Sequence, residues 1–348
     1  MDADGVVSEE VEGFFVPATC SYNSDDERFK VPIAVGLMVE GQEGVTWREW
    51  KALAAAAEEY GFSGLWRSDH YLSETIGSNR DALDAWGTIC ALSALTSRIR
   101  LGTLVSPASF RHPSVLAKLV VTADHVSGGR VELGMGTGWF EAEHLAYGFP
   151  FSDKRSRMAV LEEQVEVIRG IWGDERFSFF GSHYRVIDLD ARPKPIQDPR
   201  PRIIIGGSGG RRGISLAARF ADEYNTPDPT DEEISTLRSA FIAECERVGR
   251  DPATASFSIV SRVLVGIDRS DLEERAVRVA RLQGEATSDR ASCLDRLPKQ
   301  WIVGTPKDLR RRLSTLEALG VNRIMLLVPL HDDLAMISLI GREVLPFV

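Results

Sequence analysis

The chain has 348 residues, of which 43% are hydrophobic and 26% are charged, and its formal net charge is −10 at pH 7. This composition is ordinary for a globular protein, and the negative charge argues against nucleic acid or an anionic membrane surface as a partner. No apolar run approaches the roughly 18 residues that span a bilayer. The cysteines Cys20, Cys90, Cys245 and Cys293 lie far apart in no metal-binding or redox spacing.

The first residues differ in character from the rest of the chain. Residues 1–30 are acidic and lack the basic start and the apolar core of a signal peptide. We therefore expect a loosely ordered extension over residues 1–30, a cytoplasmic protein, and a single domain over residues 31–348.

After residue 30, short apolar runs alternate with amphipathic helical stretches. Eight runs are predicted as strands, over residues 33–39, 64–67, 99–105, 131–134, 202–205, 222–225, 258–265 and 323–328. Helices are predicted over residues 47–60, 82–95, 114–125, 155–171, 214–220, 231–248, 306–319 and 334–345. Residues 271–300 begin as a helix, and we expect a mobile loop over residues 284–292.

This alternation predicts an α/β fold. Strands too apolar to face water indicate a parallel sheet covered by helices, and eight βα units in a row favour one closed (β/α)8 barrel over an open sheet. Residues 174–201 are an insertion between the fourth helix and the fifth strand. Its first part, residues 177–186, is predicted as a hairpin, and a proline-rich loop follows.

The fifth predicted strand ends in a glycine-rich turn that precedes a helix. Its residues are Gly206, Gly207, Ser208, Gly209, Gly210, Arg211 and Arg212. Glycines let the backbone approach an anion, and the N–H groups and dipole of a helix N-terminus favour negative charge. The turn therefore predicts a phosphate site, with the two arginines adding positive charge. The alternative is a tight turn whose glycines serve packing alone.

Polar residues follow several other strands, at the barrel end where active sites lie. Asp69 and His70 follow the second strand, where His70 can exchange a proton near neutral pH and Asp69 can orient the imidazole or a cofactor. A structural loop histidine is the alternative. The run 134–139 has three alternating glycines that let backbone lie against a planar ring, unless it is only a bulge or tight turn. Asn225 follows the sixth strand and faces the barrel mouth.

Other chemistries lack their motifs in this sequence. The histidines do not combine with acids at metal-ligand spacing, and there is neither a nucleophile elbow nor a dinucleotide-binding glycine fingerprint. A phosphate site, glycine-lined walls and one proton-transfer group suit a flavin-like cofactor whose ring carries out the redox chemistry.

Residues from about 31 to 347 resemble the luciferase-like monooxygenase superfamily, in its branch that uses the deazaflavin coenzyme F420. The matching segments are residues 65–70, 98–105, 110–113, 127–130, 134–139, 205–209 and 217–222. The resemblance implies a (β/α)8 barrel, usually a homodimer, that holds an isoalloxazine-like ring in the barrel mouth and acts on a small molecule.

Carried over by position, the resemblance implies the following cofactor contacts. Asp69 and His70 lie beside the reactive ring, and Thr103-Leu104 falls where the family often has a non-proline cis peptide. Ser106, in the loop after that strand, is assigned to the cofactor as well, together with Gly136, Thr137 and Gly138. The phosphate is assigned to the 206–209 turn, with Arg211 and Arg212 beside it.

One position departs from the family pattern. The sugar-phosphate dehydrogenases of this branch carry a catalytic Glu where this chain has Trp139, which argues against sugar-phosphate oxidation and leaves the second proton donor unassigned. Glu141 and Glu143 are nearby, and neither is assigned. Trp139, Phe140, Tyr147 and Phe149 are expected to line an apolar substrate site, with Asn225 beside it.

We therefore predict an F420-dependent oxidoreductase that moves a hydride between the cofactor and a small hydrophobic organic substrate, with His70 and Asp69 as the catalytic residues. The alternative on the same barrel is an FMN-dependent monooxygenase that uses oxygen. A third possibility is a non-catalytic relative that only binds the cofactor. No metal is expected. The arginine pair favours F420, because its tail carries extra carboxylates.

Overall fold

The computed structural model describes residues 32–75, 78–285 and 289–348. The predicted extension over residues 1–30 lies outside the described residues, as does part of the loop predicted over residues 284–292. Among the described residues, no helix is both long and apolar enough to cross a membrane.

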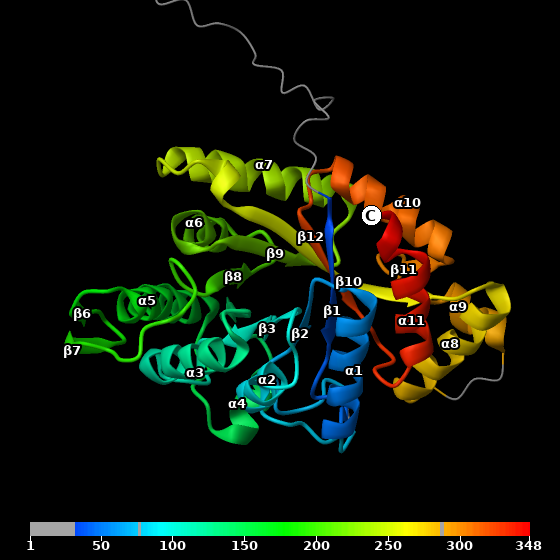
Figure 1. Ribbon diagram of the computed structural model, residues 1–348, viewed down its shortest axis with the longest axis horizontal. Helices are drawn as coiled ribbons and strands as arrows, with labels where there is room; N and C mark the ends of the chain where they lie inside the picture. The colour runs from blue at the N-terminus through cyan, green and yellow to red at the C-terminus, as the bar shows by residue number, and fades with distance from the viewer. Residues whose placement is uncertain (1–31, 76–77, 286–288) are drawn as a thin grey trace, which may run out of the picture. The chain divides into compact units, whose positions relative to one another are not determined.

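Parallel strands form a closed barrel in residues 32–348, and the described part of the chain supplies eight of them (Figure 1). In order around the barrel they are β1 (Ala34–Val39), β2 (Gly64–Arg67), β3 (Arg100–Thr103), β5 (Val131–Gly136), β8 (Arg202–Gly206), β9 (Glu223–Pro227), β10 (Ser256–Val265) and β12 (Arg323–Leu327). The barrel closes because β12 pairs with β1 in parallel register. Two short strands, β4 (Ser106–Pro107) and β11 (Ile302–Gly304), pair with β5 and β10.

Helices lie between the strands and around the outside of the barrel (Figure 1). Their bounds are α1 (Trp47–Tyr60), α2 (Ala85–Ser93), α3 (Pro113–Ser127), α4 (Glu141–Tyr147), α5 (Lys154–Trp172), α6 (Arg211–Phe220), α7 (Asp231–Arg247), α8 (Arg269–Leu282), α9 (Arg290–Asp295), α10 (Pro306–Ala318) and α11 (Leu334–Glu343). Local signals fix several ends. Thr46 and Glu49 form a capping box at α1, and Gly61 ends that helix in the left-handed conformation.

The predicted barrel is confirmed, and so is the insertion between the fourth predicted helix, α5, and the fifth barrel strand, β8. The insertion contains the antiparallel hairpin β6 (Phe177–Phe180) and β7 (Arg185–Leu189), which lies beside α5 (Figure 1). The sequence did not predict α4, a short helix after β5. In the region left unplaced, α8 and α9 form, and α9 occupies most of the second half of the predicted loop.

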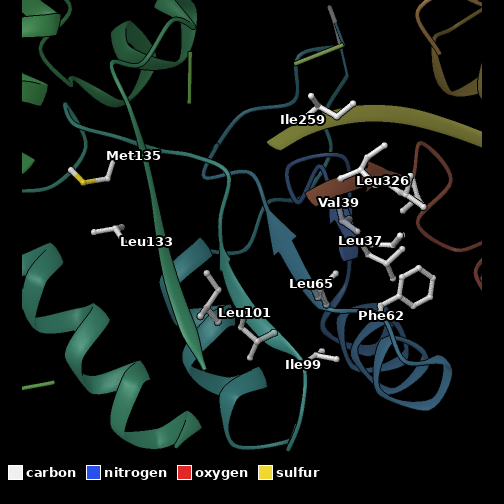
Figure 2. Packing of buried hydrophobic residues seen from close by; sticks show 14 of the residues in the cluster. Leu37, Val39, Phe62, Leu65, Ile99, Leu101, Leu133, Met135, Ile259 and Leu326 are labelled. Atoms are coloured by element: carbon white, nitrogen blue, oxygen red, sulfur yellow. The ribbon is translucent and has the colours of Figure 1, made fainter. Parts of the chain in front are cut away.

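Side chains alternate along the strands between two apolar layers. Leu37, Leu65, Leu101, Leu133 and Leu326 point outward and pack in the layer beneath the helices, as Figure 2 shows for neighbouring strands. The inward-facing cluster is smaller and consists of Met38, Trp66, Leu104, Ile204, Met325 and Leu327. This alternation gives the barrel a filled interior.

Trp66 fills the middle of the barrel because its neighbours are glycines. A Cβ at Gly36 would lie 2.3 Å from the Trp66 ring, and one at Gly102 would lie 3.1 Å from it. The side chain is fully buried. Arg323 places its guanidinium 4.6 Å from the centre of the Trp66 ring, on the side of the strand N-termini. The interior is therefore closed below this indole, and open space begins above it.

Candidate active site at the C-terminal end of the barrel

A cavity of about 430 Å³ opens at the C-terminal ends of the strands. Its walls contain both apolar and charged side chains. They are formed by Met38, Glu40, Ser68, His70, Glu74, Leu104, Val105, Pro107, Gly136, Thr137, Gly138, Trp139, Gly206, Gly207, Ser208, Asn225, Pro227, Asp228, Val260, Arg262 and Leu327. We call it the ring cavity. It lies where the sequence predicted the site, and the predicted residues His70, Leu104 and Gly136–Gly138 line it.

Val105 forms the floor between two glycines of this cavity. A Cβ at Gly136 would lie 2.6 Å from Cγ2 of Val105, and a Cβ at Gly206 would lie 2.9 Å from its Cγ1. The peptide bond between Leu104 and Val105 is a non-proline cis bond. It lies one bond further along the chain than the Thr103-Leu104 position that the resemblance implied.

His70 is held in one orientation by a carboxylate from α4. Its Nδ1 lies 2.9 Å from Oε2 of Glu143, which is fully buried. The other oxygen, Oε1, accepts hydrogen bonds from the backbone N–H groups of Tyr71 and Leu72. Burial lowers the pKa of His70, but the hydrogen bond and charge of Glu143, with the charges of Glu40 and Glu74, outweigh it and raise that pKa. Because Nδ1 faces Glu143, Nε2 is the nitrogen available to the cavity.

Asp69 does not contact the imidazole that it was expected to orient. Its carboxylate is fully buried and accepts from Arg111, whose Nη1 lies 2.6 Å from Oδ2, and from the hydroxyl of Ser106, also at 2.6 Å. That hydroxyl in turn contacts Thr103 Oγ1 at 3.2 Å. None of Asp69, Thr103 and Ser106 lines the ring cavity. They form a hydrogen-bonded layer, and Glu143 holds His70 in place of Asp69.

A second cavity, of about 410 Å³, lies over the glycine-rich turn and the N-terminus of α6. It shares Thr137, Gly206, Gly207 and Ser208 with the ring cavity. Helix α6 begins at Arg211 with no side-chain cap, so its first N–H groups are left for another acceptor. We call this the phosphate cavity.

Tyr224 fixes the backbone of the glycine-rich turn from below. Its hydroxyl accepts from the N–H of Gly209 at 2.9 Å and donates to the carbonyl of Gly207 at 3.1 Å. Gly209 has a φ of +88°, where a side chain is strained, and its Cβ would meet Leu237 at 2.5 Å. A Cβ at Gly209 has no room, so this turn keeps its backbone bare. These features fit a phosphate group.

The charges around the phosphate cavity differ from those predicted. Arg212 pairs with both carboxylate oxygens of Glu162, at 2.6 and 3.1 Å, so its charge is neutralised. Arg211 lines the cavity, together with Lys154 and Arg155 from the first turn of α5. Among the described residues, Lys154 and Arg155 have no acidic side chain within ion-pair distance. The sequence did not indicate these two residues, because they lie about 50 positions away in the chain.

The predicted substrate residues separate into two places. Trp139 lines the ring cavity, is 60% exposed, and lies with its ring centre 6.0 Å from that of His70. Asn225 also lines the cavity and donates to Ser258 at 2.8 Å. Tyr147 and Phe149 instead pack against Tyr71 with tilted rings, outside the ring cavity. Of the four aromatic residues expected to form an apolar wall, Trp139 alone lines the ring cavity.

Four charged residues of the ring cavity were missed by the sequence reasoning: Glu40, Glu74, Asp228 and Arg262. Arg262 donates to Asp228 at 2.7 Å. Glu40 and Asp228 directly follow β1 and β9, and Arg262 lies near the end of β10, which is the signal that the sequence carries for these three; Glu74 lies seven residues beyond the end of β2. They give the cavity a polar side opposite Leu104, Val105 and Trp139.

Comparison with known proteins gives one family match and relatives of two kinds. The family model described as luciferase-like monooxygenase matches residues 29–323. The chain is 28% identical over 326 residues to an FMNH(2)-dependent dimethylsulfone monooxygenase of Pseudomonas putida. This match covers 86% of this chain and 87% of that protein. The chain is 29% identical over 316 residues to an F420-dependent glucose-6-phosphate dehydrogenase of Nakamurella multipartita, with 84% and 90% covered.

Among solved structures, the coenzyme F420 dependent tetrahydromethanopterin reductase from Methanopyrus kandleri has a TM-score of 0.75 against this chain. The likeness covers 91% of this chain and 99% of the reductase at 20% sequence identity. At this identity the likeness concerns the fold, and it agrees with the barrel described above.

Proposed function

The chain belongs to the luciferase-like monooxygenase family, and we propose that within it this protein is an F420-dependent oxidoreductase acting on a small organic substrate. The observation that carries this proposal is the junction of the two cavities at Thr137 and Gly206–Ser208. A planar ring in the ring cavity and a phosphate over α6 would then belong to one cofactor.

Positive charge beyond the phosphate supports F420 over FMN. Lys154, Arg155 and Arg211 line the outer part of the phosphate cavity. The deazaflavin tail carries carboxylates after its phosphate, whereas FMN ends at the phosphate. Unpaired cations near this end therefore attract the longer, more negative tail more strongly.

The residues of the ring cavity suit proton transfer to a bound substrate. When bound, the deazaflavin supplies a hydride or accepts one. His70 presents Nε2 to the cavity while Glu143 holds Nδ1, so the imidazole can deliver or take the accompanying proton. Leu104, Val105 and Trp139 would pack against the apolar part of the substrate, and Asn225 would face its polar part.

An FMN-dependent monooxygenase is the second candidate, and the similarity to the FMNH(2)-dependent relative favours it. The same glycine-rich turn and the same ring cavity suit FMN. What separates the two candidates is the contribution of the outer cations to affinity.

The test is a titration of the apoprotein with F420 and with FMN, followed by fluorescence and calorimetry. We expect tighter binding of F420. The double variant Lys154→Ala/Arg155→Ala should weaken F420 binding by about thirtyfold and FMN binding less, since about 1 kcal/mol per charge is the scale of such exposed interactions and two charges are removed. Arg176→Ala in the hairpin serves as the control, because Arg176 pairs with Asp188 away from both cavities.

Equal or tighter binding of FMN, together with oxygen consumption by the reduced complex, would assign the protein to the monooxygenases. An equal loss for both cofactors in the double variant would remove Lys154 and Arg155 from recognition of the tail.

A further inference from the structure

Glu74 lies where the ring cavity meets a third cavity, of about 230 Å³. Both are lined by Glu40, Glu74, Arg262 and Leu327, so the two cavities are adjacent on this side. The Glu74 side chain is 35% exposed, whereas that of His70 is 10% exposed. Glu74 therefore lies between the buried imidazole and a more accessible space.

The nitrogen of His70 that faces the cavity also faces Glu74. Oε1 of Glu74 lies 3.8 Å from Nε2 of His70, four residues further along the loop that follows β2. Since Glu143 engages Nδ1, a proton that enters or leaves the imidazole on the cavity side passes through Nε2. Glu74 is the acidic residue nearest to that nitrogen among the ion pairs of the described chain.

The surroundings of Glu74 raise the pKa of its carboxyl group. Burial and the charges of Glu40 and Glu43 raise the pKa of Glu74, and the opposing effects of His70 and Arg262 do not cancel this rise. Gln42 donates from one nitrogen to Glu40 at 2.9 Å and to Glu74 at 3.4 Å, so the two carboxyl groups are held close together. A carboxyl group whose pKa lies nearer to neutral is a more effective proton donor.

We propose that Glu74 is the second proton-transfer group of this enzyme, acting through His70 by exchanging a proton with Nε2. The inference rests on the proposed function. It assigns the second proton donor, which the sequence left unassigned because this chain has Trp139 in place of the family's Glu. The indole ring of Trp139 lies 6.0 Å from the His70 ring and has no acidic group. Glu74, in the loop that follows β2, places its carboxyl group beside the same imidazole.

The proton exchange between Glu74 and His70 accounts for all protons and electrons when a polarised double bond is reduced. The bound reduced deazaflavin would supply a hydride, with both electrons, to the electrophilic atom, and the proton on Nε2 of His70 would go to the other atom of the double bond. The lone pair now on Nε2 takes the proton of the Glu74 carboxyl group. The Glu74 carboxylate then takes up a proton from bulk solvent by way of the third cavity, which restores the protonation of both side chains and leaves the cofactor oxidised.

The first test uses the apoprotein and needs no cofactor. The imidazole of His70 is titrated by NMR in the wild type and in Glu74→Gln. Removal of the neighbouring carboxylate should lower the pKa of His70, and Glu74→Asp should restore part of the difference. Glu141→Gln is the matched control, because Glu141 is exposed on α4 and absent from the cavity walls. An unchanged His70 titration in Glu74→Gln overturns the pairing.

The second test follows turnover with reduced F420 against pH, using an electrophile that the wild type reduces. Glu74→Gln should lower kcat by at least about tenfold, the lower part of the usual range for a positioned acid, and should move the basic limb of the profile to lower pH. KM should change much less. A merely structural Glu74 would leave the position of that limb unchanged, and that result overturns the inference.

Failure of the proposed function is a separate outcome. The proposed function is wrong if none of the electrophiles tried makes the wild type oxidise reduced F420, and if the protein instead binds FMN and consumes oxygen. The apoprotein titration then decides by itself whether Glu74 and His70 are paired.

Discussion

The two ends of the barrel interior are both rich in charge, but they use it differently. At the N-terminal end, Arg323 lies between Glu132 and Glu223, donating from Nη1 to Oε1 of Glu132 at 3.2 Å and from Nη2 to Glu223. Burial raises the pKa of Glu132, but Arg323 and Arg100 outweigh it and hold that pKa below its ordinary value. At the C-terminal end, the charged groups instead line cavities.

Large residues and glycines explain this difference. Below the middle of the barrel, Trp66 and the buried ion pairs fill the space. Above it, Gly136 and Gly206 let Val105 pack directly against their backbone, and the ring cavity opens beside these three residues. We therefore expect charge at the closed end to act on stability and charge at the open end to act on ligands. Substitutions at the two ends should separate these effects.

The largest effect should come from the closed end. Arg323→Met removes the most buried of the arginines paired with Glu132 and Glu223 and leaves them only the more exposed Arg100 and Arg202, and breaking such a buried arrangement costs about 3–5 kcal/mol. The unfolding midpoint in urea should fall accordingly. Arg312→Met, which removes the exposed pair with Asp231, should change it much less. A similar small change in both variants would contradict a stabilising role for the buried pairs.

The next effect should come from the glycine-rich turn. Gly207→Asp places a carboxylate beside the phosphate position, and like charges a few ångströms apart in a partly screened site should weaken cofactor binding at least about a hundredfold. Its Cβ lies 3.2 Å from the Tyr224 hydroxyl, so Gly207→Asn is the control for size without charge. Equal affinities of the two variants in the titration, with the fold retained, would argue against a phosphate there.

A smaller effect is expected at His70. His70→Asn should lower kcat by at least roughly tenfold, with cofactor affinity changed less, because a positioned acid contributes to the chemical step. His112→Asn is the control. His112 accepts from the N–H of Ser114 as the N-cap of α3, so it serves the helix. An unchanged kcat in His70→Asn would remove the imidazole from the mechanism.

The smallest effect should be on the pH dependence of stability. Because the pKa of His70 is raised in the folded protein, its stabilising contribution is complete below the unfolded value, about 6.5, and is lost as pH rises through the folded value. The stability difference between wild type and His70→Asn should therefore shrink from acidic to alkaline pH. Urea unfolding at several pH values measures it, and a difference that grows with pH would contradict the raised pKa.

Much of the fold was predictable because its signals are local. Strands such as Arg202–Gly206 carry runs of β-branched residues, and α1 has its capping residues within four positions of its ends. The helix α4 was missed because its seven residues follow a glycine-rich strand end without a side-chain cap. A helix this short depends on its packing more than on its own sequence.

The sequence by itself determined the alternation of strands and helices, the glycines after β5 and β8, and the position of His70 after β2. These follow from side-chain periodicity and from backbone freedom, which are properties of neighbouring residues. The tertiary structure alone decided which charges meet: Glu143 with His70 across 73 positions, Arg111 with Asp69, Arg212 with Glu162, and Lys154 and Arg155 beside the glycine-rich turn. Coulomb interactions and hydrogen bonds act over a few ångströms of space whatever the separation along the chain, so only the closed barrel brings these groups together.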